Sequence, residues 1–514
     1  MDIALSSLAA VFSPTVLLVI LASAVYGLAI GAIPGLTATM ATALLVPLTL
    51  FADPIISLAA IVTSSAMAIF AGDIPGALLR IPGTPASAAY VDDTYQLRLA
   101  GKLEVALGIN VLSSAVGGII GTTALVLLAP QLAEIAIQFS SYEYFWFCLL
   151  GLSCAALVAN ASPLKSTASV LLGLLMSTVG LDAVMGQQRF TFGSMNLMAG
   201  LSLIAVLVGL FAMSELLRKA ATLHHALPPP AHVRGSLLKV SMPAMLKNRW
   251  QTLRGSVVGT VIGILPGAGS DVAAWVSYSI SKRFSRTPER FGHGHEEGVI
   301  EASAANNASL SGAYVPTLVF GVPGDTITAI VIGVLLMQGI TPGPMVFVTS
   351  AELVSSLFII FFIANVLMIP LGIIAIRASR HVLGVDPRML YPILMSLCIV
   401  GTLSVNNLIF DLWIMLAAGL LAWFLEKNDY PLAPLILGFV LGRMVEDSFL
   451  SNVLKGDGNP IAFVNRPMSA ALACVVVSAW SWMIFAALRR RHRNRKDEAD
   501  AHASAASASS GSNR

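Results

Sequence analysis

Two apolar stretches of this chain carry the same spacing of glycine and proline: Gly27-Leu-Ala-Ile-Gly31-Ala-Ile-Pro34-Gly35 and Gly259-Thr-Val-Ile-Gly263-Ile-Leu-Pro266-Gly267. The second follows the first by 266 − 34 = 232 positions. Further along, Pro82-Gly83 recurs as Pro323-Gly324 at an offset of 323 − 82 = 241. Two matched breaks in the same order predict an internal duplication. Paired Gly/Pro-interrupted hydrophobic segments are typical of the binding site of a secondary transporter.

The composition places this duplication in a membrane. The 514 residues are 56% hydrophobic and 11% charged, and the mean hydropathy is +0.82. Soluble domains carry roughly 25% charged residues, so most of this surface must face lipid. A net charge of +3 offers no phosphate-neutralising face, which excludes a nucleic-acid partner. We therefore expect an all-α polytopic membrane protein.

The apolar runs predict about twelve crossings or partial crossings in two homologous repeats. The runs 13–50, 302–350 and 388–425 exceed one span, so each must contain a break or a hairpin. We expect a first transmembrane repeat at 1–217, a linker at 218–254, a second repeat at 255–488 and a basic, then disordered, tail at 489–514. The basic linker and tail should be cytoplasmic by the positive-inside rule.

Each Pro-Gly break leaves backbone N–H and C=O groups that lipid cannot satisfy, so it must line a cavity or be buried. Helix N-termini at such breaks suit a carboxylate, and free carbonyls suit a small cation. The substrate-binding candidates at the breaks are Pro82, Gly83, Thr84, Pro266, Gly267, Gly269, Pro323 and Gly324. The coupling-ion candidates there are Pro34, Gly35, Thr37, Ser270, Asp271, Asp325 and Thr326. The alternative is that proline, glycine and hydroxyl side chains serve helix packing alone.

Two further polar features lie near the breaks. Arg80 precedes Pro82-Gly83 by two residues and is a candidate to hold a substrate carboxylate. Asp73 is expected to pair with Arg80 or to carry a coupling proton or cation. Asn306 and Asn307 offer uncharged amides to a polar substrate. The alternatives are an Arg80 side chain that extends to the membrane interface and a helix cap at the asparagines.

Other function classes lack a signature. Gly267-Ala-Gly269-Ser270 is not followed by the Gly-Lys-Ser/Thr of a nucleotide-binding loop. His293 and His295 lie in a charged loop typical of a solvated surface, and no metal or cofactor is expected beyond a coupling Na⁺ or H⁺. Without a catalytic motif an intramembrane enzyme is a minor alternative, and a channel is the other.

The sequence resembles the large membrane subunit of tripartite tricarboxylate transporters. The similarity lies in Ile81-Pro82-Gly83-Thr84-Pro85-Ala86-Ser87, in the 259–269 stretch, in Ala304-Ala-Asn306-Asn307-Ala and in Thr341-Pro342-Gly343-Pro344. It covers roughly residues 15–485. The resemblance implies gradient-driven import of an organic carboxylate across the bacterial inner membrane. It also implies a periplasmic solute-binding protein and a small membrane subunit as partners.

The resemblance has local departures. Arg80 stands where the family often has Asn, and Ala71-Gly72-Asp73 stands where the family has Tyr-Gly-Gly. Ser303 replaces a common Glu, and Asp93-Thr94-Tyr95-Gln96 replaces Asp-Gly-Tyr-Pro. We interpret the extra Arg80 and Asp73 as a buried pair that favours an anion other than citrate.

We expect the two repeats to be inverted relative to each other. The stretch 282–290 is basic, while the equivalent 48–55 carries no basic residue. Single cysteines in these two stretches should therefore react with an impermeant maleimide from opposite sides of the membrane. Labelling of both from the same side would contradict the inversion.

Overall fold

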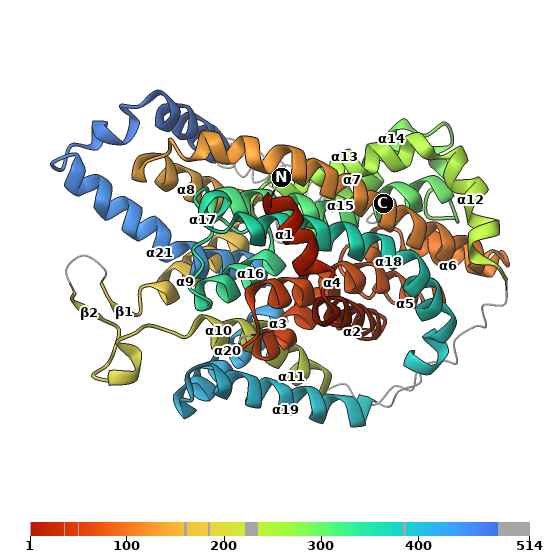
Figure 1. Ribbon diagram of the computed structural model, residues 1–514, viewed down its shortest axis with the longest axis horizontal. Helices are drawn as coiled ribbons and strands as arrows, with labels where there is room; N and C mark the ends of the chain where they lie inside the picture. Colours follow the sequence, from red (N-terminus) through yellow and green to blue (C-terminus); the bar gives the residue numbers. More distant parts are fainter. Residues whose placement is uncertain are drawn as a thin grey trace, which may run out of the picture.

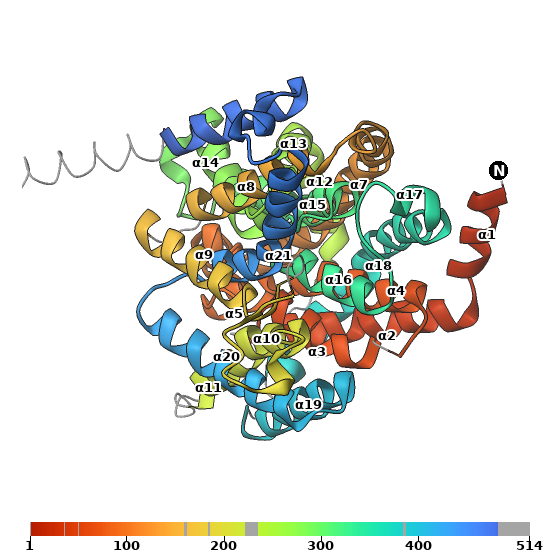
Figure 2. The ribbon, with the colours of Figure 1, turned by 90° about the vertical axis from the view of Figure 1, so that its left-hand side faces the viewer.

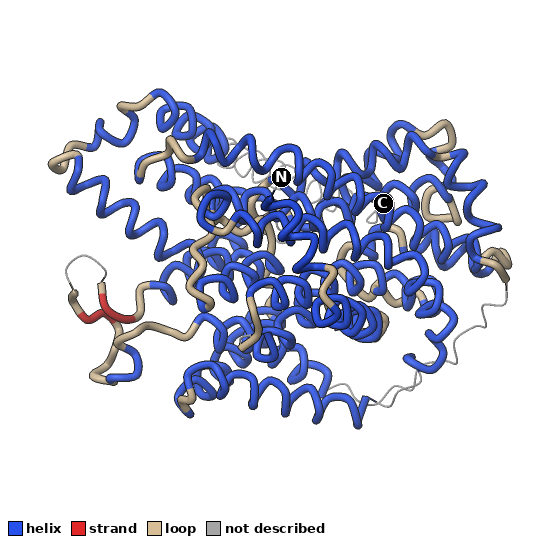
Figure 3. The backbone as a smooth tube through the Cα atoms, viewed as in Figure 1, coloured by secondary structure: helices blue, strands red, loops and turns tan. Residues whose placement is uncertain are grey.

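The computed structural model describes residues 2–34, 36–49, 51–158, 162–182, 186–220, 235–383 and 387–481, and these are almost entirely helical (Figure 1). One short antiparallel hairpin pairs β1 (Gly180–Leu181) with β2 (Gln188–Arg189), with Gly180 opposite Arg189 (Figure 3). The expectation of an all-α fold is therefore confirmed, with this hairpin as a small addition at the edge.

The helices of the first half follow one another with few long connections. Their bounds are α1 Asp2–Val11, α2 Pro14–Gly31, α3 Ala38–Thr49, α4 Pro54–Ala71, α5 Asp73–Leu79, a 3-10 helix Ser87–Ala89, α6 Val91–Leu99, α7 Leu103–Ala136, α8 Ser141–Val158, α9 Pro163–Ser177, a 3-10 helix Met195–Leu197, α10 Leu203–Val208, a π-helix Gly209–Met213 and α11 Ser214–Ala220. Figure 2 shows α1 at the outer edge of the helical body.

The second half begins inside the expected linker. Its helices are α12 Leu237–Lys247, α13 Arg249–Ile264, α14 Gly269–Phe284, a 3-10 helix Pro288–Arg290, α15 Glu296–Phe320, α16 Thr326–Met337, α17 Val346–Thr349, α18 Ala351–Leu383, α19 Pro387–Asn406, α20 Ile409–Lys427, α21 Leu432–Lys455 and a 3-10 helix Pro460–Val464. The linker residues 221–234 and the expected tail 489–514 lie outside the described residues. The rest of the linker includes α12, which packs on α7 through a hydrogen bond from Ser241 Oγ to the Glu104 carbonyl oxygen at 3.2 Å.

Five of the described helical segments are long and apolar enough to cross a membrane. They are Pro14–Gly31, Pro54–Leu79, Leu103–Ala136, Ala351–Ser379 and Ile409–Lys427. Shorter apolar helices such as Ala38–Thr49 and Thr326–Met337 are too short to cross alone, as expected of segments next to a break. The count of about twelve crossings and the inversion of the repeats stay predictions.

All three long apolar runs contain a break, as their lengths predicted. The run 13–50 divides between α2 and α3, the run 302–350 between α15 and α16, and the run 388–425 between α19 and α20. A fourth break separates α13 from α14 at 265–268. The expected breaks in these runs are therefore present. Pro-Gly pairs lie at the breaks after α2, α13 and α15, whereas the break between α19 and α20 lies at Asn407, which has a φ of 53°.

The two halves repeat the same close helix contacts. Gly27 of α2 faces Ser64 of α4, and the matched Gly259 of α13 faces Ala305 of α15. A Cβ at Gly27 would lie 2.3 Å from the Ser64 carbonyl oxygen, and one at Gly259 would lie 2.3 Å from that of Ala305. Gly27 and Gly259 are related by the offset of 232, and Ser64 and Ala305 by the offset of 241. The duplication is therefore present in the packing, with glycine required for the close approach of two backbones.

The halves also interlock. The long helix α7 of the first half packs along α15, and α18 of the second half packs along α4. All residues of α15 from Gly298 to Val319 are buried, so this helix forms the interior of the protein. This packing brings the breaks of both halves to one place.

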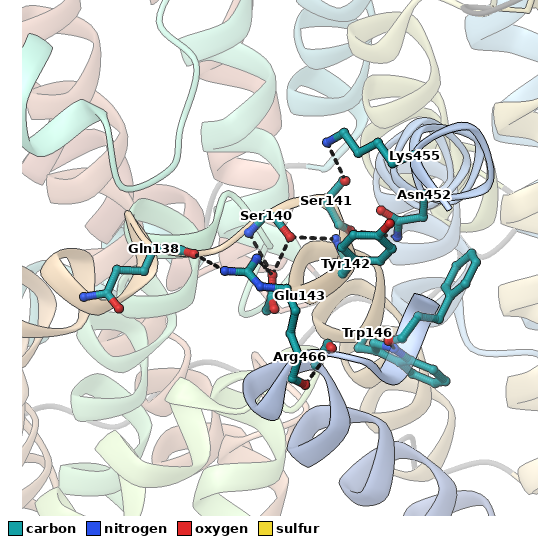
Figure 4. Close-up of polar contacts among 11 residues, drawn as sticks. Gln138, Ser140, Ser141, Tyr142, Glu143, Trp146, Asn452, Lys455 and Arg466 are labelled. Carbon is teal, nitrogen blue, oxygen red and sulfur yellow. Dashed lines mark hydrogen bonds and ion pairs between the residues drawn. The ribbon is translucent and has the colours of Figure 1, made fainter. Parts of the chain in front are cut away.

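A polar clamp holds α8 against the C-terminal part of the chain (Figure 4). Arg466 forms an ion pair with Glu143 at 2.9 Å, and the Glu143 carboxylate is 1% exposed. Asn452 of α21 donates to the Ser141 carbonyl oxygen at 3.1 Å. The ion pair therefore ties the start of α8 to the segment after the 3-10 helix Pro460–Val464, and the Asn452 hydrogen bond ties it to α21.

We predict that Gly263→Val destabilises the protein. A Cβ at Gly263 would lie 2.3 Å from the Ser309 carbonyl oxygen, so α13 and α15 would have to separate. Overpacking of this kind costs about 1–3 kcal/mol, which should lower the melting temperature in detergent by several degrees.

The matched control is Val261→Leu, because Val261 lies on the same helix and is exposed. It should melt like the unsubstituted protein. An unchanged melting temperature for Gly263→Val would contradict the packing of α13 on α15.

Candidate functional site

A cavity of about 610 Å³ lies where the helix breaks of the two halves meet. The starts of α3, α14 and α16 line it through Thr37 to Thr39, Gly267 to Val272, and Asp325 to Ile327. Thr84 and Pro85 bring the remaining break of the first half to the same wall. Three helix N-termini therefore point their first turns at one space, and helix N-termini favour anions.

The breaks that follow α5 and α15 carry matched capping boxes. In the second half, Asp325 N–H donates to Thr328 Oγ1 at 2.9 Å, and Thr328 N–H donates to Asp325 Oδ1 at 2.8 Å. In the first half, Thr84 N–H donates to Ser87 Oγ at 3.1 Å, and Ser87 N–H donates to Thr84 Oγ1 at 3.2 Å. These side chains satisfy N–H groups that the breaks would otherwise leave unpaired.

Each half also contacts the break of the other half. Thr39 Oγ1 lies 3.0 Å from Thr326 Oγ1, which joins the start of α3 to the start of α16. Ala86 N–H donates to Asp271 Oδ1 at 3.1 Å, which joins the first-half break to the start of α14. Thr39 and Asp271 match at the offset of 232, and each contacts the later break of the other half. The two contacts are therefore equivalent in the two halves. The cavity is consequently built jointly by both halves.

The Pro266-Gly267 break needs glycine for two reasons. Gly267 has a φ of +83° and donates its N–H to the Gly324 carbonyl oxygen at 2.8 Å. A Cβ there would also lie 2.8 Å from Ala155 of α8. A side chain would therefore strain the backbone and displace the wall of the cavity.

The structure brings together about half of the predicted site residues. Those that line the cavity are Thr37, Thr84, Gly267, Gly269, Ser270, Asp271, Asn306, Asp325 and Thr326. Those that do not line it are Pro34, Asp73, Arg80, Pro82, Gly83, Pro266, Asn307, Pro323 and Gly324. Gly35 lies outside the described residues. The prolines and Gly83 and Gly324 lie in the same breaks, where they shape the backbone behind the lining.

The expected pair between Arg80 and Asp73 is wrong. Arg80 Nη2 lies 2.7 Å from Asp92 Oδ1, and the Arg80 side chain is 57% exposed. Arg80 has a φ of 59° and caps the end of α5, while Asp73 begins the same helix and faces inward. The turn after α5 thus sends the two side chains apart. The argument for an anion other than citrate loses its basis.

The two asparagines have different surroundings. Both lie in the middle of α15, so a helix cap is excluded for them. Asn307 Nδ2 donates to the Ala66 carbonyl oxygen of α4 at 3.1 Å, which links the two halves. Asn306 lines the cavity, and its Nδ2 lies 3.5 Å from Tyr90 Oη.

Charged residues on one side of the cavity were missed by the sequence analysis. Arg218 and Glu215 of α11 form an ion pair and line the cavity, as do Glu426 and Asp429 near the end of α20. Asp429 also lies 3.5 Å from Lys165 Nζ. The signal for the first pair was its spacing of three residues at the end of the apolar run 196–217. The residues near α20 are far away in sequence and carried no such signal.

Comparison with known proteins decides the family. The profile of the tripartite tricarboxylate transporter TctA family matches residues 17–437. This chain belongs to that family. Members of the TctA family are components of tricarboxylate transporters. The tripartite organisation of these transporters implies a binding protein and a small membrane subunit as partners. The expected resemblance, and with it a multi-pass membrane transporter component, is confirmed.

Two relatives of this TctA-family chain come from Agrobacterium vitis. An uncharacterized 52.8 kDa protein in the TAR-I ttuC′ 3′ region is 33% identical over 458 residues, which cover 88% of this chain and 91% of the relative. An uncharacterized protein in the TAR-II ttuC′ 3′ region is 34% identical over 225 residues, which cover 43% of this chain and 93% of the relative. No solved structure matches the chain.

We predict that cysteines at positions 39 and 326 form a disulfide across the cavity. The hydroxyl oxygens of Thr39 and Thr326 lie 3.0 Å apart, so cysteines at these positions can approach closely enough to bond. The test uses the Thr39→Cys, Thr326→Cys double variant, with the four native cysteines changed to alanine. After cleavage at a protease site inserted in the 221–234 linker, mild oxidation should keep the two halves as one band on a non-reducing gel.

The control pairs Thr326→Cys with Val261→Cys, since Val261 is exposed on α13. This control should separate into two fragments. Separation of the 39–326 variant under the same oxidation would refute the contact between the two breaks.

Proposed function

We propose that this chain is the permease for secondary active import of an organic carboxylate across the bacterial inner membrane. A sodium or proton gradient would drive the import, and a periplasmic solute-binding protein would deliver the substrate. The observation that carries the proposal is the meeting of three helix N-termini from both halves on one cavity. Such N-termini at a repeat interface suit an anionic substrate group.

The polar lining supports recognition of a carboxylate. The first turns of α3 and α14 present backbone N–H groups, and Thr37 and Ser270 add hydroxyl donors. Arg218 adds a guanidinium to the cavity lining, where it is paired with Glu215. A dicarboxylate or tricarboxylate has more than one carboxylate to place near these donors, which fits the tricarboxylate class of the family.

The cavity acids supply a reason for cation coupling. Asp271 and Asp325 line the cavity, the first half-buried and the second 7% exposed, and as carboxylates they repel an incoming anion. Two unit charges 4 Å apart interact by about 4 kcal/mol at an effective dielectric constant of about 20. A cation bound with the substrate would offset this repulsion, which makes the two binding events mutually favourable. A channel gains nothing from this arrangement, because it does not need to couple two fluxes.

Alternating access would use the duplicated packing. Each half holds its own broken segments, and the two sets touch through the Thr39–Thr326 and Asp271–Ala86 contacts. Rocking of one half against the other around these contacts would expose the cavity to each side in turn. The C-terminal tail is expected to face the cytoplasm.

We predict saturable carboxylate uptake by cells that express this chain with its neighbouring genes. Labelled dicarboxylates, tricarboxylates and aromatic carboxylates should be compared with and without sodium and with a protonophore. Uptake that requires one of the two gradients would support the symport. Asp271→Asn should lower uptake by about tenfold, because the cavity loses a cation partner worth at least about 1.4 kcal/mol.

The matched control is Asp457→Asn, an acid-to-amide change at an exposed position after α21. Uptake by this control should equal that of the unsubstituted protein. The proposal would be rejected if no carboxylate enters while all subunits are present in the membrane. Uptake that follows the substrate gradient alone would instead favour a channel.

A further inference from the structure

A buried carboxyl group lies behind the cavity and outside its lining. Asp73 is the first residue of α5 and is 2% exposed. Its Oδ1 accepts a hydrogen bond from Tyr90 Oη at 2.6 Å. Its Oδ2 is buried and has no hydrogen-bond partner within the described part of the chain. One oxygen of this carboxyl is therefore satisfied and the other is not.

Asp73 is connected to the cavity through two buried side chains. Tyr90 is 1% exposed, and its hydroxyl donates to Asp73 and lies 3.5 Å from Asn306 Nδ2. Asn306 lines the cavity, and its own Oδ1 is buried without a partner among the described residues. The row Asp73, Tyr90, Asn306 thus runs from the protein interior to the cavity wall.

Among the described residues, the helices that pack on α5 bring no ion-pair partner to Asp73, and the Arg98 guanidinium of α6 lies 5.5 Å from the centroid of the Tyr95 ring. The helix α4 has no ionisable residue. On α6, Asp92 is paired with Arg80, and Asp93 accepts N–H groups from Gly292, Gly294 and His295. No ion pair found among the described residues includes Asp73.

The other helices that pack on α5, namely α7 and α18, carry their charged residues near their ends. The ionisable residues of α7 are Glu104 in its first turn and Glu134 in its last, and those of α18 are Glu352 in its first turn and the residues from Arg377 onward. Near the 3-10 helix 87–89, Asp271 of α14 is bonded to Ala86 N–H. On α15, Glu301 is paired with Arg254 at 2.7 Å. Tyr90 is therefore the titratable group that contacts Asp73.

The repeated packing does not require an acid at this position. Tyr314 of α15 is the residue of the second half that matches Asp73 at the offset of 241. Tyr314 is fully buried, and its hydroxyl also has no partner in the described part of the chain. The same place in the fold accepts a neutral side chain, so the acid needs another explanation than packing.

An unpaired carboxylate in a buried site costs several kcal/mol. A proton removes the charge at once, whereas a metal cation needs several ligands. The described residues hold no group of three or more His, Cys, Asp or Glu that could bind a metal ion. A proton needs one oxygen, and Asp73 Oδ2 offers it.

We propose that Asp73 is a proton-binding site that couples proton movement to passage of the substrate. This inference rests on the proposed transport function and names the coupled ion at a site separate from Asp271 and Asp325. In a conformation in which cavity water reaches Asp73, a hydronium ion gives its proton to Asp73 Oδ2, so one O–H bond breaks in hydronium and one forms on the carboxyl. Water is left behind, and the proton returns to water on the other side.

The coupling follows from charge. A neutral Asp73 removes one negative charge from the region behind the cavity, so an anionic substrate binds more favourably after protonation. By linkage, bound substrate raises proton affinity at Asp73 by the same factor. Tyr90 holds the carboxyl in place through its hydrogen bond, and Asn306 sits between this pair and the substrate.

The first test needs no substrate. Infrared difference spectra of the complex in liposomes, recorded during a pH titration, distinguish the carbonyl stretch of a carboxylic acid from that of a carboxylate. We expect a titrating carboxyl band that Asp73→Asn abolishes and that Asp457→Asn leaves in place. Tyr90→Phe removes one hydroxyl and keeps the ring, so it should shift the midpoint pH of this band. Absence of an Asp73-dependent band would overturn the proposal.

The second test uses labelled citrate as the probe in proteoliposomes that contain all subunits. Asp73→Asn mimics the neutral acid, so citrate exchange at equal concentrations should persist while accumulation driven by a pH gradient falls by about tenfold or more. Accumulation at the unsubstituted level in Asp73→Asn, or uptake driven by sodium alone, would overturn the proton site. If citrate does not enter with any variant, the infrared titration decides the inference, and the carboxylate panel decides the transport function separately.

Discussion

Interrupted helices inside a membrane must satisfy their own polar backbone, and the rest of this structure depends on that constraint. Lipid offers no hydrogen bonds, so each of the breaks needs protein partners. The capping boxes Thr84–Ser87 and Asp325–Thr328 satisfy the breaks from within each half. Contacts between the halves, such as Ala86 N–H to Asp271, complete the set. Satisfying the backbone therefore forces the breaks together, and the cavity is the result.

The same constraint explains the division between small and polar residues. Glycines on α2 and α13 let these helices approach α4 and α15 at backbone distance, which leaves room for the breaks to meet. Because α15 is buried along its length, its asparagines face other helices: Asn307 bonds to α4 and Asn306 reaches the cavity. Asn307 therefore contributes to helix packing and Asn306 to the cavity, since successive positions on a helix face different directions.

The breaks, the duplication and the family could be recognised from residues close together in sequence. The breaks depend on local backbone chemistry at Pro34, Pro266, Gly83 and Gly324. Proline restricts φ and lacks an N–H donor, and glycine permits unusual φ values, so the effect of each can be predicted from the sequence alone. The pairing of Arg80 with Asp73 could not be judged in this way. The left-handed turn at Arg80 sends its side chain to Asp92, and Asp73 meets Tyr90 instead. Likewise Asp429 reaches the cavity because α20 packs beside α11.

Residue composition and spacing are enough to predict a helical membrane protein whose helices break at matched Pro-Gly pairs that are flanked by small polar residues. Composition, spacing and chain-local backbone chemistry are sufficient for that, because each depends on a residue and its immediate neighbours. Which polar groups face a common cavity, and which are buried behind it, depends instead on the folded arrangement of the helices. That division depends on contacts between residues hundreds of positions apart, such as Thr39 with Thr326 and Asn306 with Tyr90. No local pattern encodes such distances, since they follow from how the helices pack.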